Sequence, residues 1–273
     1  MPDYEATTVL LESLLQLRRK PVAFKFLMDE SEYNAFKANQ KTGMIAYCTA
    51  VSRASFGDTY KLTAKNFACS GAARALGFID PGSDTLSGSR RVKNGSYKDL
   101  CISRDVSRNM VYCRHKIFGI GLTPLDKYEY TVTPDIILLI TDSYDAMRVI
   151  QGYAYHYGHA KNVRLAGMQA ICQECTSYPF ETNDINISMM CPGTRMLAQW
   201  ARDEIGIGIP FNKFEAVVDG ILHTANPFER NDNKKIIEKK LKANGLEDTL
   251  KIEYNKNYDD GGYKGISEYI NHK

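Results

Sequence analysis

The sequence predicts an α+β fold with an internal duplication: two pseudo-symmetric halves share one core, and a charged extension follows at the C-terminus. Three observations predict this class. Apolar runs that begin with proline, as strands often do, alternate with segments of helical periodicity. Five short blocks occur twice in the same order. After residue 227 the composition changes, and lysine, asparagine, aspartate and glycine become frequent.

Composition limits the cellular setting and the partners. The chain has 273 residues, of which 44% are hydrophobic, so it can bury a large core. A net charge of +3 is too small to indicate nucleic acid or a membrane surface as a partner. No stretch approaches the roughly 18 apolar residues of a membrane span, and the acidic start does not resemble a signal peptide. We expect a cytoplasmic protein with no nucleic-acid or membrane partner, and the sequence leaves a homo-oligomer open.

The repeat is the strongest organisational signal, because five matches in one order are much harder to obtain by chance than a single match. The segments Gly43–Cys48 and Gly167–Cys172 are identical at four of their six positions. The paired blocks are Pro21–Leu27 with Pro134–Ile140, Asn34–Gln40 with Asp145–Gln151, Gly43–Cys48 with Gly167–Cys172, Cys69–Gly71 with Cys191–Gly193, and Pro124–Glu129 with Pro210–Glu215.

The repeat sets the predicted boundaries. Residues 1–129 form the first half with an N-terminal helix, residues 130–227 form the second half, and residues 228–273 form the extension. Two copies of one unit usually pack about a pseudo-twofold axis, in the way that symmetric dimers do. Equivalent positions near that axis are then expected to meet.

In the first half we expect a helix over Tyr4–Arg19, a strand over Pro21–Leu27 and a short helix near residues 31–40. Residues 80–110 are rich in glycine, serine, aspartate and arginine, which predicts long loops with one strand at Lys98–Ile102. Another strand is expected over Lys116–Leu122.

The second half begins with a strand at Pro134 and continues with a helix from Asp142 to about His159. A further helix is expected over Phe214–Leu222. In the extension, Asn231–Asn244 has the pattern of an amphipathic helix that stops at Gly245.

The last pair of blocks predicts two matching helix starts. Asp126 and Asn212 are residue types that cap helices, and a glutamate follows each of them three positions later, at Glu129 and Glu215. This spacing is typical of a capping box.

The chain has seven cysteines, and both this odd number and the expected reducing compartment argue against a disulfide framework. Four of them form a matched set across the two halves: Cys48, Cys69, Cys172 and Cys191. Cys175 completes a C-x-x-C pair with Cys172, but its counterpart in the first half is Val51, so it ranks below the matched four. Cys101 and Cys113 have no counterparts and are interpreted as structural or incidental.

Cys69 and Cys191 each lie two residues before a glycine, at the start of a helical pattern. Glycine permits a tight turn and a close approach of the backbone, and the first amides of a helix favour the thiolate form that binds metals. Four thiolates suit an iron–sulfur cluster or a tetrahedral zinc ion. Buried thiols in tight turns, or a reactive thiol without metal, are the alternatives.

At these residues the sequence resembles the family called domain of unknown function 169 (DUF169), over roughly residues 10–222. The resemblance rests on the order of four segments: Cys48 before Arg53-Ala54-x-x-Gly57, Cys69-x-Gly71-Ala72-Ala73-x-Ala75-Leu76-Gly77, Gly167-Met168-Gln169-x-x-Cys172, and Asn186-x-Ser188-x-x-Cys191-x-Gly193-x-Arg195. It implies an archaeal or anaerobic bacterial setting, in which an oxygen-sensitive cluster is plausible. It also implies cysteines at the matched four positions but not usually at Cys175, and it implies no particular reaction.

Five further residues are candidates for binding a small anionic ligand. Lys25 interrupts an apolar strand, where it is either a buried cation or a solvated lysine. Arg53, Gln169 and Arg195 lie near the cysteine blocks, as does Arg74, and the three arginines could bind an anion or balance the charge of a cluster. Surface ion pairing is the alternative for all three arginines.

The leading hypothesis is an iron–sulfur protein that uses the four matched cysteines in electron transfer or as a redox accessory, with a redox partner protein or a small anionic ligand. The alternatives are a zinc-stabilised module that binds a small ligand, and a metal-free thiol-dependent enzyme. No Walker loop, dinucleotide-binding fingerprint, zinc-protease motif or serine-hydrolase elbow occurs in the sequence. If the protein is an enzyme, an oxidoreductase-type activity is expected.

Overall fold

The computed structural model describes residues 4–128 and 132–254. The chain divides into two compact units, and each is described by itself. The sheet unit comprises Arg19–Ser143 and Lys161–Asn212, and the helical unit comprises Met1–Arg18, Tyr144–Ala160 and Lys213–Lys273.

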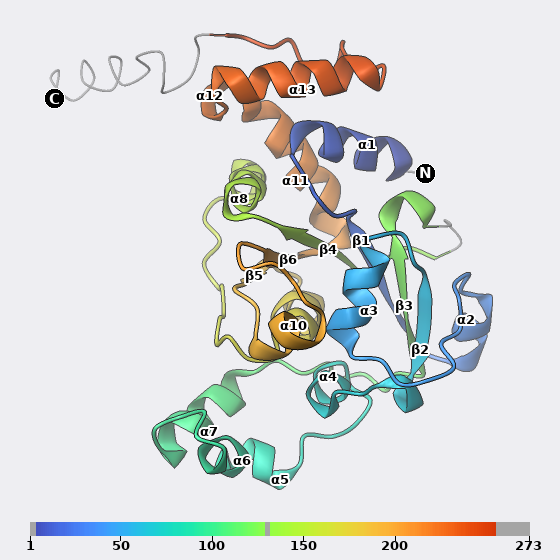
Figure 1. Cartoon of the computed structure of the whole chain (residues 1–273), viewed down its shortest axis with the longest axis vertical. Helices are drawn as coiled ribbons and strands as arrows, with labels where there is room; N and C mark the ends of the chain where they lie inside the picture. Colours follow the sequence, from blue (N-terminus) through green and yellow to red (C-terminus); the bar gives the residue numbers. More distant parts are fainter. Residues whose placement is uncertain (1–3, 129–131, 255–273) are drawn as a thin grey trace, which may run out of the picture. The chain divides into compact units, whose positions relative to one another are not determined.

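One antiparallel sheet of six strands forms the centre of the sheet unit, which confirms the predicted α+β class (Figure 1). The strand order is β2-β3-β1-β4-β6-β5. The strands are β1 (Val22–Leu27), β2 (Tyr60–Thr63), β3 (Gly119–Pro124), β4 (Ile136–Thr141), β5 (Asn186–Ser188) and β6 (Ile205–Pro210). Strands β1 and β4 pair at the middle of the sheet and are the two strands predicted to begin after proline.

The pleat assigns alternate residues to two faces of the sheet, because successive side chains of a strand point in opposite directions. Phe24 on β1 lies opposite Leu122 on β3 and Ile136 on β4, and all three are buried in one hydrophobic cluster. We call the face that carries these residues the core face. Lys25 lies opposite Gly121 and therefore belongs to the other face.

Short helices connect the strands of this unit. They are α2 (Glu30–Ala35), α3 (Tyr47–Ala54), η1 (Ala64–Asn66), α4 (Ser70–Ala75), α5 (Ser83–Leu86), α6 (Ser89–Lys93), α7 (Leu100–Asn109), η2 (Leu125–Lys127), η3 (Ala170–Ser177), α9 (Tyr178–Thr182) and α10 (Pro192–Leu197). Of these, η1 and η2 are 3₁₀ turns, whereas η3 is a π-helix. Residues of α3 and η3 join the hydrophobic cluster of the core face.

A glycine in β6 allows η3 to lie directly on the sheet. A Cβ atom at Gly208 would lie 2.6 Å from the carbonyl carbon of Cys175 in η3. Contacts this close do not occur for real Cβ atoms, so only glycine permits the observed separation of helix and strand. Gly208 lies opposite Leu138 of β4 and therefore on the core face.

The region over residues 80–110 differs from the prediction, because it contains three helices, α5, α6 and α7, in place of long loops. The predicted strand at Lys98–Ile102 is wrong. Asp99 caps α7, and its carboxylate accepts a hydrogen bond from the Ile102 backbone N–H at 2.9 Å. This cap sets a helical start where the short apolar pattern suggested a strand. The short helix near residues 31–40 is also displaced: α2 ends at Ala35, and Phe36 is extended.

The two predicted helix starts do not match one another. Asp126 lies inside the 3₁₀ turn η2, and Glu129 lies outside the described residues. In the second half the helix begins at Phe211, so Asn212 occupies the first turn and does not cap it.

The helical unit consists of α1 (Tyr4–Leu14), α8 (Ser143–Tyr157), α11 (Phe211–His223), α12 (Ala225–Phe228) and α13 (Asn231–Ala243). Gly152 of α8 and Gly220 of α11 let these two helices approach closely. A Cβ atom at Gly152 would lie 2.5 Å from the Val217 carbonyl oxygen. The helix predicted from Asp142 to about His159 is therefore present as α8, and its glycine marks the crossing point.

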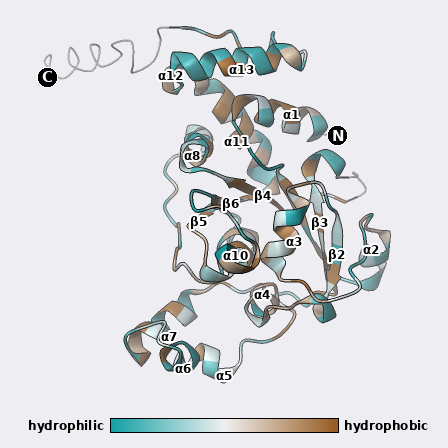
Figure 2. Ribbon diagram, viewed as in Figure 1, coloured by the Kyte–Doolittle hydropathy of each residue, from teal (hydrophilic) through white to brown (hydrophobic). Residues whose placement is uncertain are grey.

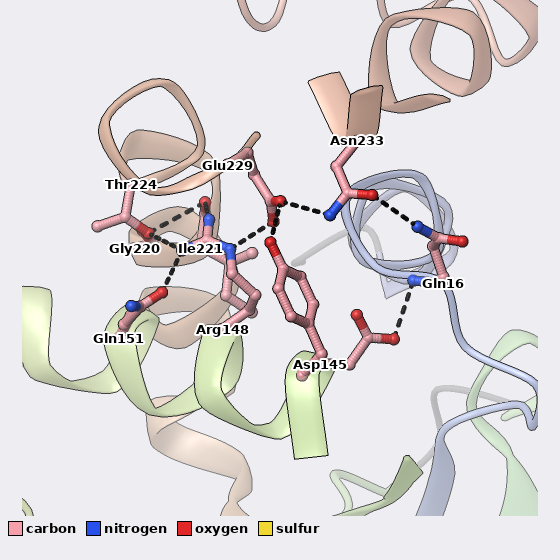
Figure 3. A network of polar contacts seen from close by, with 10 residues as sticks. Gln16, Asp145, Arg148, Gln151, Gly220, Ile221, Thr224, Glu229 and Asn233 are labelled. Carbon is pink, nitrogen blue, oxygen red and sulfur yellow. Dashed lines mark hydrogen bonds and ion pairs between the residues drawn. The ribbon is translucent and has the colours of Figure 1, made fainter. Parts of the chain in front are cut away.

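A buried polar network holds the helical unit together (Figure 3). The Arg148 guanidinium donates to Glu229 Oε1 at 2.6 Å, and both side chains are almost fully buried. Arg148 also donates to the Ile221 carbonyl at 3.0 Å and to Thr224 Oγ1 at 3.2 Å. Asn233 of α13 donates to Glu229, so the network joins α8 to the C-terminal helices.

The predicted amphipathic helix of the extension is confirmed as α13, whose residues are mostly hydrophilic, whereas those of β4 are mostly hydrophobic (Figure 2). Within the helical unit α13 packs against α1. Lys240 donates to the carbonyls of Glu12 and Leu15 at 2.9 and 2.7 Å, and so satisfies acceptors at the C-terminal end of α1. Among the described residues, no helix combines the length and apolar character that crossing a bilayer requires.

Candidate functional site

Each of the four matched cysteines lies at or near the start of a helix in the sheet unit. Cys48 is the second residue of α3, and Cys172 lies in the first turn of η3. Cys69 and Cys191 are the N-cap residues of α4 and α10. The two halves therefore present their cysteines from the same kind of position.

The glycine of each C-x-G segment lies beside the sulfur of its cysteine. A Cβ atom at Gly71 would lie 3.6 Å from Cys69 Sγ, and one at Gly193 would lie 3.7 Å from Cys191 Sγ. These are ordinary van der Waals separations, and neither glycine has a positive φ. The conformational freedom of glycine is therefore not required at either position.

The four cysteines line one cavity of about 280 Å³, which we call the cysteine cavity. Most of the other lining residues are apolar: Tyr47, Ala72, Met168, Ala170, Ile171, Pro192 and Leu197. Segments more than one hundred residues apart in the sequence thus meet around one space.

The helices that carry the cysteines contact each other between the two predicted halves. In the sheet unit α3 contacts α10, and α4 contacts η3. Gln169, immediately before η3, donates to the Gly71 carbonyl at 2.6 Å, and Cys48 Sγ lies 3.9 Å from the Gly193 carbonyl as a weak donor. The glycine carbonyl of each C-x-G segment therefore accepts a hydrogen bond from a residue of the other predicted half, at or near the start of a cysteine-bearing helix.

The electrostatic environment keeps two of these thiols protonated while no cation is present. Burial, followed by the nearby Cys191 and Cys69, raises the pKa of Cys48 to about 11. Burial also raises the pKa of Cys172 well above its ordinary value, and Cys191, Cys69 and Cys48 add to this effect. Negative charge on several of these sulfurs at once is therefore unfavourable unless a positive group lies among them.

The described residues contain no group of three or more histidine, cysteine, aspartate or glutamate side chains arranged to hold a metal ion. A tetrahedral zinc site needs four sulfurs at about 2.3 Å from one point. The four cysteines instead surround an open volume. Thiols of this kind are the donors used by both iron–sulfur clusters and zinc ions.

The other cysteines lie outside this cavity, and all seven are free thiols. Cys175 is fully buried in η3 against β6, Cys113 is buried, and Cys101 is exposed. Burial raises the pKa of Cys113 to about 12. Cys175 thus packs against the sheet, as its lower rank in the sequence suggested.

Lys25 does not line the cysteine cavity. Its ammonium group lies 2.8 Å from Asp135 Oδ1, and both side chains are largely buried. Asp135 also accepts from the Phe26 backbone N–H at 2.7 Å, and its pKa is raised by burial in spite of Lys25. Lys25 therefore belongs to an ion pair on the face opposite to the core face.

None of the predicted arginines Arg53, Arg74 and Arg195 lines the cysteine cavity. Arg53 is exposed in the last turn of α3. Arg195 donates to the backbone carbonyls of Ala201 and Glu204, the second at 2.6 Å, and thereby holds the loop between α10 and β6. Of the five predicted ligand-binding residues, only Gln169 lines the cysteine cavity.

Two features of the site escaped prediction. The cysteine motif of the second half continues as a π-helix. This conformation is rare in proteins, and where it occurs it often lies at a functional site. Gln169, the residue before this helix, has a φ of 52°. The second feature is Arg91, which donates to Gln169 Oε1 at 2.8 Å. Its segment was predicted as a loop, so no sequence signal pointed to a buried arginine.

Comparison with known proteins confirms the expected family. The family model DUF169, described as Uncharacterised ArCR, matches residues 10–220. The uncharacterized protein MJ0308 of Methanocaldococcus jannaschii is 26% identical over 156 residues. That match covers 57% of this chain and 66% of the relative, slightly less than two thirds of its length. No solved structure matches the chain.

Proposed function

The chain belongs to the DUF169 family, and from its cysteine cavity we propose that it binds an iron–sulfur cluster and acts in electron transfer or as a redox accessory protein. The single observation that carries this proposal is the meeting of Cys48, Cys69, Cys172 and Cys191 around one cavity. These thiols come from the starts of four separate helices, and a shared ligand is one reason for them to meet.

The four thiols are the residues that would hold the cluster. Cysteine thiolates are the usual ligands of such clusters, and a bound cluster would supply one-electron transfer. The apolar lining would limit the access of water, which together with hydrogen bonds to sulfur tunes the reduction potential. Thr194 Oγ1 lies 3.8 Å from Cys191 Sγ, while its hydroxyl proton is donated to the Cys191 carbonyl at 2.6 Å.

Two alternatives remain outcomes of the test. A structural zinc ion would use the same four sulfurs, each at about 2.3 Å from the metal. A metal-free thiol enzyme would require a thiolate near neutral pH, whereas the pKa values of Cys48 and Cys172 are raised. The raised pKa values argue against the thiol enzyme, and the metal content of the protein decides between a cluster and zinc.

We also propose that the two halves descend from a duplication. The strand order supports this, since β2-β3-β1 from one edge corresponds to β5-β6-β4 from the other, with β1 and β4 paired at the centre. The hydrogen bonds that the Gly71 and Gly193 carbonyls each accept from the other half add further support. Seven free cysteines support a cytoplasmic location, because such thiols persist in reducing compartments.

The test is metal analysis of the whole chain after anaerobic purification, combined with a visible absorption spectrum. We expect iron and acid-labile sulfide in similar amounts. Cys69→Ser and Cys191→Ser should each remove most of the iron, because each removes one of four ligands. Cys101→Ser is the matched control and should retain it, because Cys101 is exposed and lies outside the cavity.

Zinc in place of iron would contradict the redox role and support a structural clasp. No metal in the anaerobic protein would contradict both metal proposals. Equal iron content in Cys69→Ser, Cys191→Ser and Cys101→Ser would show that the matched cysteines are not the ligands.

A further inference from the structure

A second cavity of about 240 Å³ lies beside the cysteine cavity in the sheet unit. Three arginines line it, Arg74, Arg90 and Arg91, and we call it the arginine cavity. The two cavities share three lining residues: Cys69, Met168 and Gln169. A ligand in the arginine cavity would therefore lie next to one of the proposed cluster ligands.

The lining of the arginine cavity has a strong positive bias. Its remaining polar residues are neutral: Ser70, Thr85, Asn94 and Gln169. Within the part of the chain that the structure describes, no aspartate or glutamate lines this space. Three guanidinium groups gathered without a counter-charge repel one another, and an anion among them would relieve that repulsion.

Arg91 is the most unusual of the three, because only 8% of it is exposed. Its Nη2 donates to Gln169 Oε1 at 2.8 Å and contacts Met110 Sδ at 3.0 Å. Its Nη1 is buried and has no hydrogen-bond acceptor among the described residues. A buried charged group with an unused donor is costly, which indicates that an acceptor is missing.

Arg74 repeats this pattern on α4. Its Nη1 donates to Ser70 Oγ at 3.1 Å, while its Nε is buried without an acceptor among the described residues. Unused donors on two arginines of one cavity are difficult to explain by local packing. An oxyanion with two or more oxygens, such as a carboxylate or a phosphate, can accept one hydrogen bond from each of these two donors.

We propose that the arginine cavity binds the oxyanion group, carboxylate or phosphate, of a small molecule. The site itself does not depend on a cluster. Its role rests on the proposed function in one respect: such a molecule would extend past Gln169 and Cys69 towards the cysteine cavity and would be the small anionic substrate of the redox centre. Gln169 would connect the two sites, because it bonds both Arg91 and the Gly71 carbonyl.

The test is isothermal titration of the anaerobically purified whole chain with inorganic phosphate and, separately, with malonate. We expect saturable binding of at least one probe, and the stronger probe identifies phosphate or carboxylate as the recognised group. Arg91→Gln should weaken binding about tenfold or more, because it removes a charge-assisted donor. Arg108→Gln is the matched control, since Arg108 is exposed on α7 outside the cavity.

Arg90→Gln provides a second test if Arg91→Gln fails to fold, because Arg90 is exposed and its loss should weaken binding with little effect on folding. Lack of saturable binding of either probe, or equal affinities in Arg91→Gln, Arg90→Gln and Arg108→Gln, would overturn the proposal. Iron content is measured on the same samples. Phosphate or malonate binding by protein that contains no iron would support the anion site and contradict the cluster. Iron in protein that binds neither anion would support the cluster and contradict the anion site.

Discussion

At the scale of single residues, the environment of each thiol distinguishes the seven cysteines. Cys48 and Cys172 line a cavity, whereas Cys175 is packed into the core against a strand, and burial raises the pKa of all three thiols. The matched positions in the sequence separated the first two from Cys175, and the cavity lining makes the same separation. The sequence did not predict the direction of the pKa shifts, because burial and neighbouring thiols depend on contacts between distant segments.

The raised pKa of Cys48 predicts a slow, strongly pH-dependent alkylation in metal-free protein. With a pKa of about 11, only about 0.1% of this thiol is ionised at pH 8, and the thiolate is the nucleophile. Because the pKa is raised, the thiolate fraction keeps rising with pH. The rate should increase about tenfold per pH unit from about pH 7.5 to 9.5. Mass spectrometry of the Cys48 peptide after timed iodoacetamide treatment measures it.

Urea-unfolded protein is the control for this measurement, because its thiols should titrate near their ordinary pKa of about 8.5. In the unfolded chain the rate should therefore level off within the same pH range. A plateau below about pH 9 in the folded, metal-free protein would contradict the effect of burial on Cys48.

At the scale of elements, local signals predicted the strands β1, β3 and β4, but they missed β2, β5 and β6 and the short helices α5 and α6. The apolar runs of β1 and β4 were recognisable because a strand requires only local alternation and a proline start. The helices α5 and α6 have four and five residues, too few to carry a periodic pattern. Arg91 lies in α6, so missing this helix also concealed the arginine cavity.

Gly208→Ala tests whether the position of η3 on the sheet supports the site. The added Cβ would lie 2.6 Å from the Cys175 carbonyl carbon, and backbone cannot move aside as a flexible side chain can. Such overpacking should reduce the free energy of unfolding by about 1–3 kcal/mol. It should also lower iron loading, because η3 carries Cys172. Urea denaturation and iron analysis measure the two effects.

The matched substitution is Gly43→Ala, which adds the same atom where no other atom lies within 4 Å and where φ is not positive. Its free energy of unfolding should stay within about 0.5 kcal/mol of the unsubstituted protein. Equal stabilities of the two variants would mean that η3 does not press on β6 as described.

At the scale of the whole molecule, the chain forms two compact units whose segments alternate along the sequence. The helical unit draws on three separated stretches, and its buried Arg148–Glu229 pair joins residues 81 positions apart. The predicted division at residues 129 and 227 follows the repeat and concerns ancestry. Compactness follows contacts, which can group stretches that are distant in the sequence.

Arg148→Met should destabilise the protein by about 3–5 kcal/mol, because it leaves the buried Glu229 carboxylate without its cation. Urea denaturation followed by circular dichroism measures this loss. Arg230→Met is the control, since the Arg230–Asp232 pair is exposed and such pairs contribute only about 0–1 kcal/mol. Similar destabilisation by both substitutions would show that the buried network does not hold the helical unit.

The sequence by itself determined the strands β1, β3 and β4, the alternation of β1 between two faces, and the four matched cysteines, because local periodicity and repeated short motifs record these features. Only the tertiary structure brought the starts of α3, α4, η3 and α10 around one cavity and buried Arg91 beside it. The physical reason is that these arrangements depend on packing between segments that are far apart in the chain. Such packing sets burial, thiol pKa values and unused hydrogen-bond donors, and no local pattern records them.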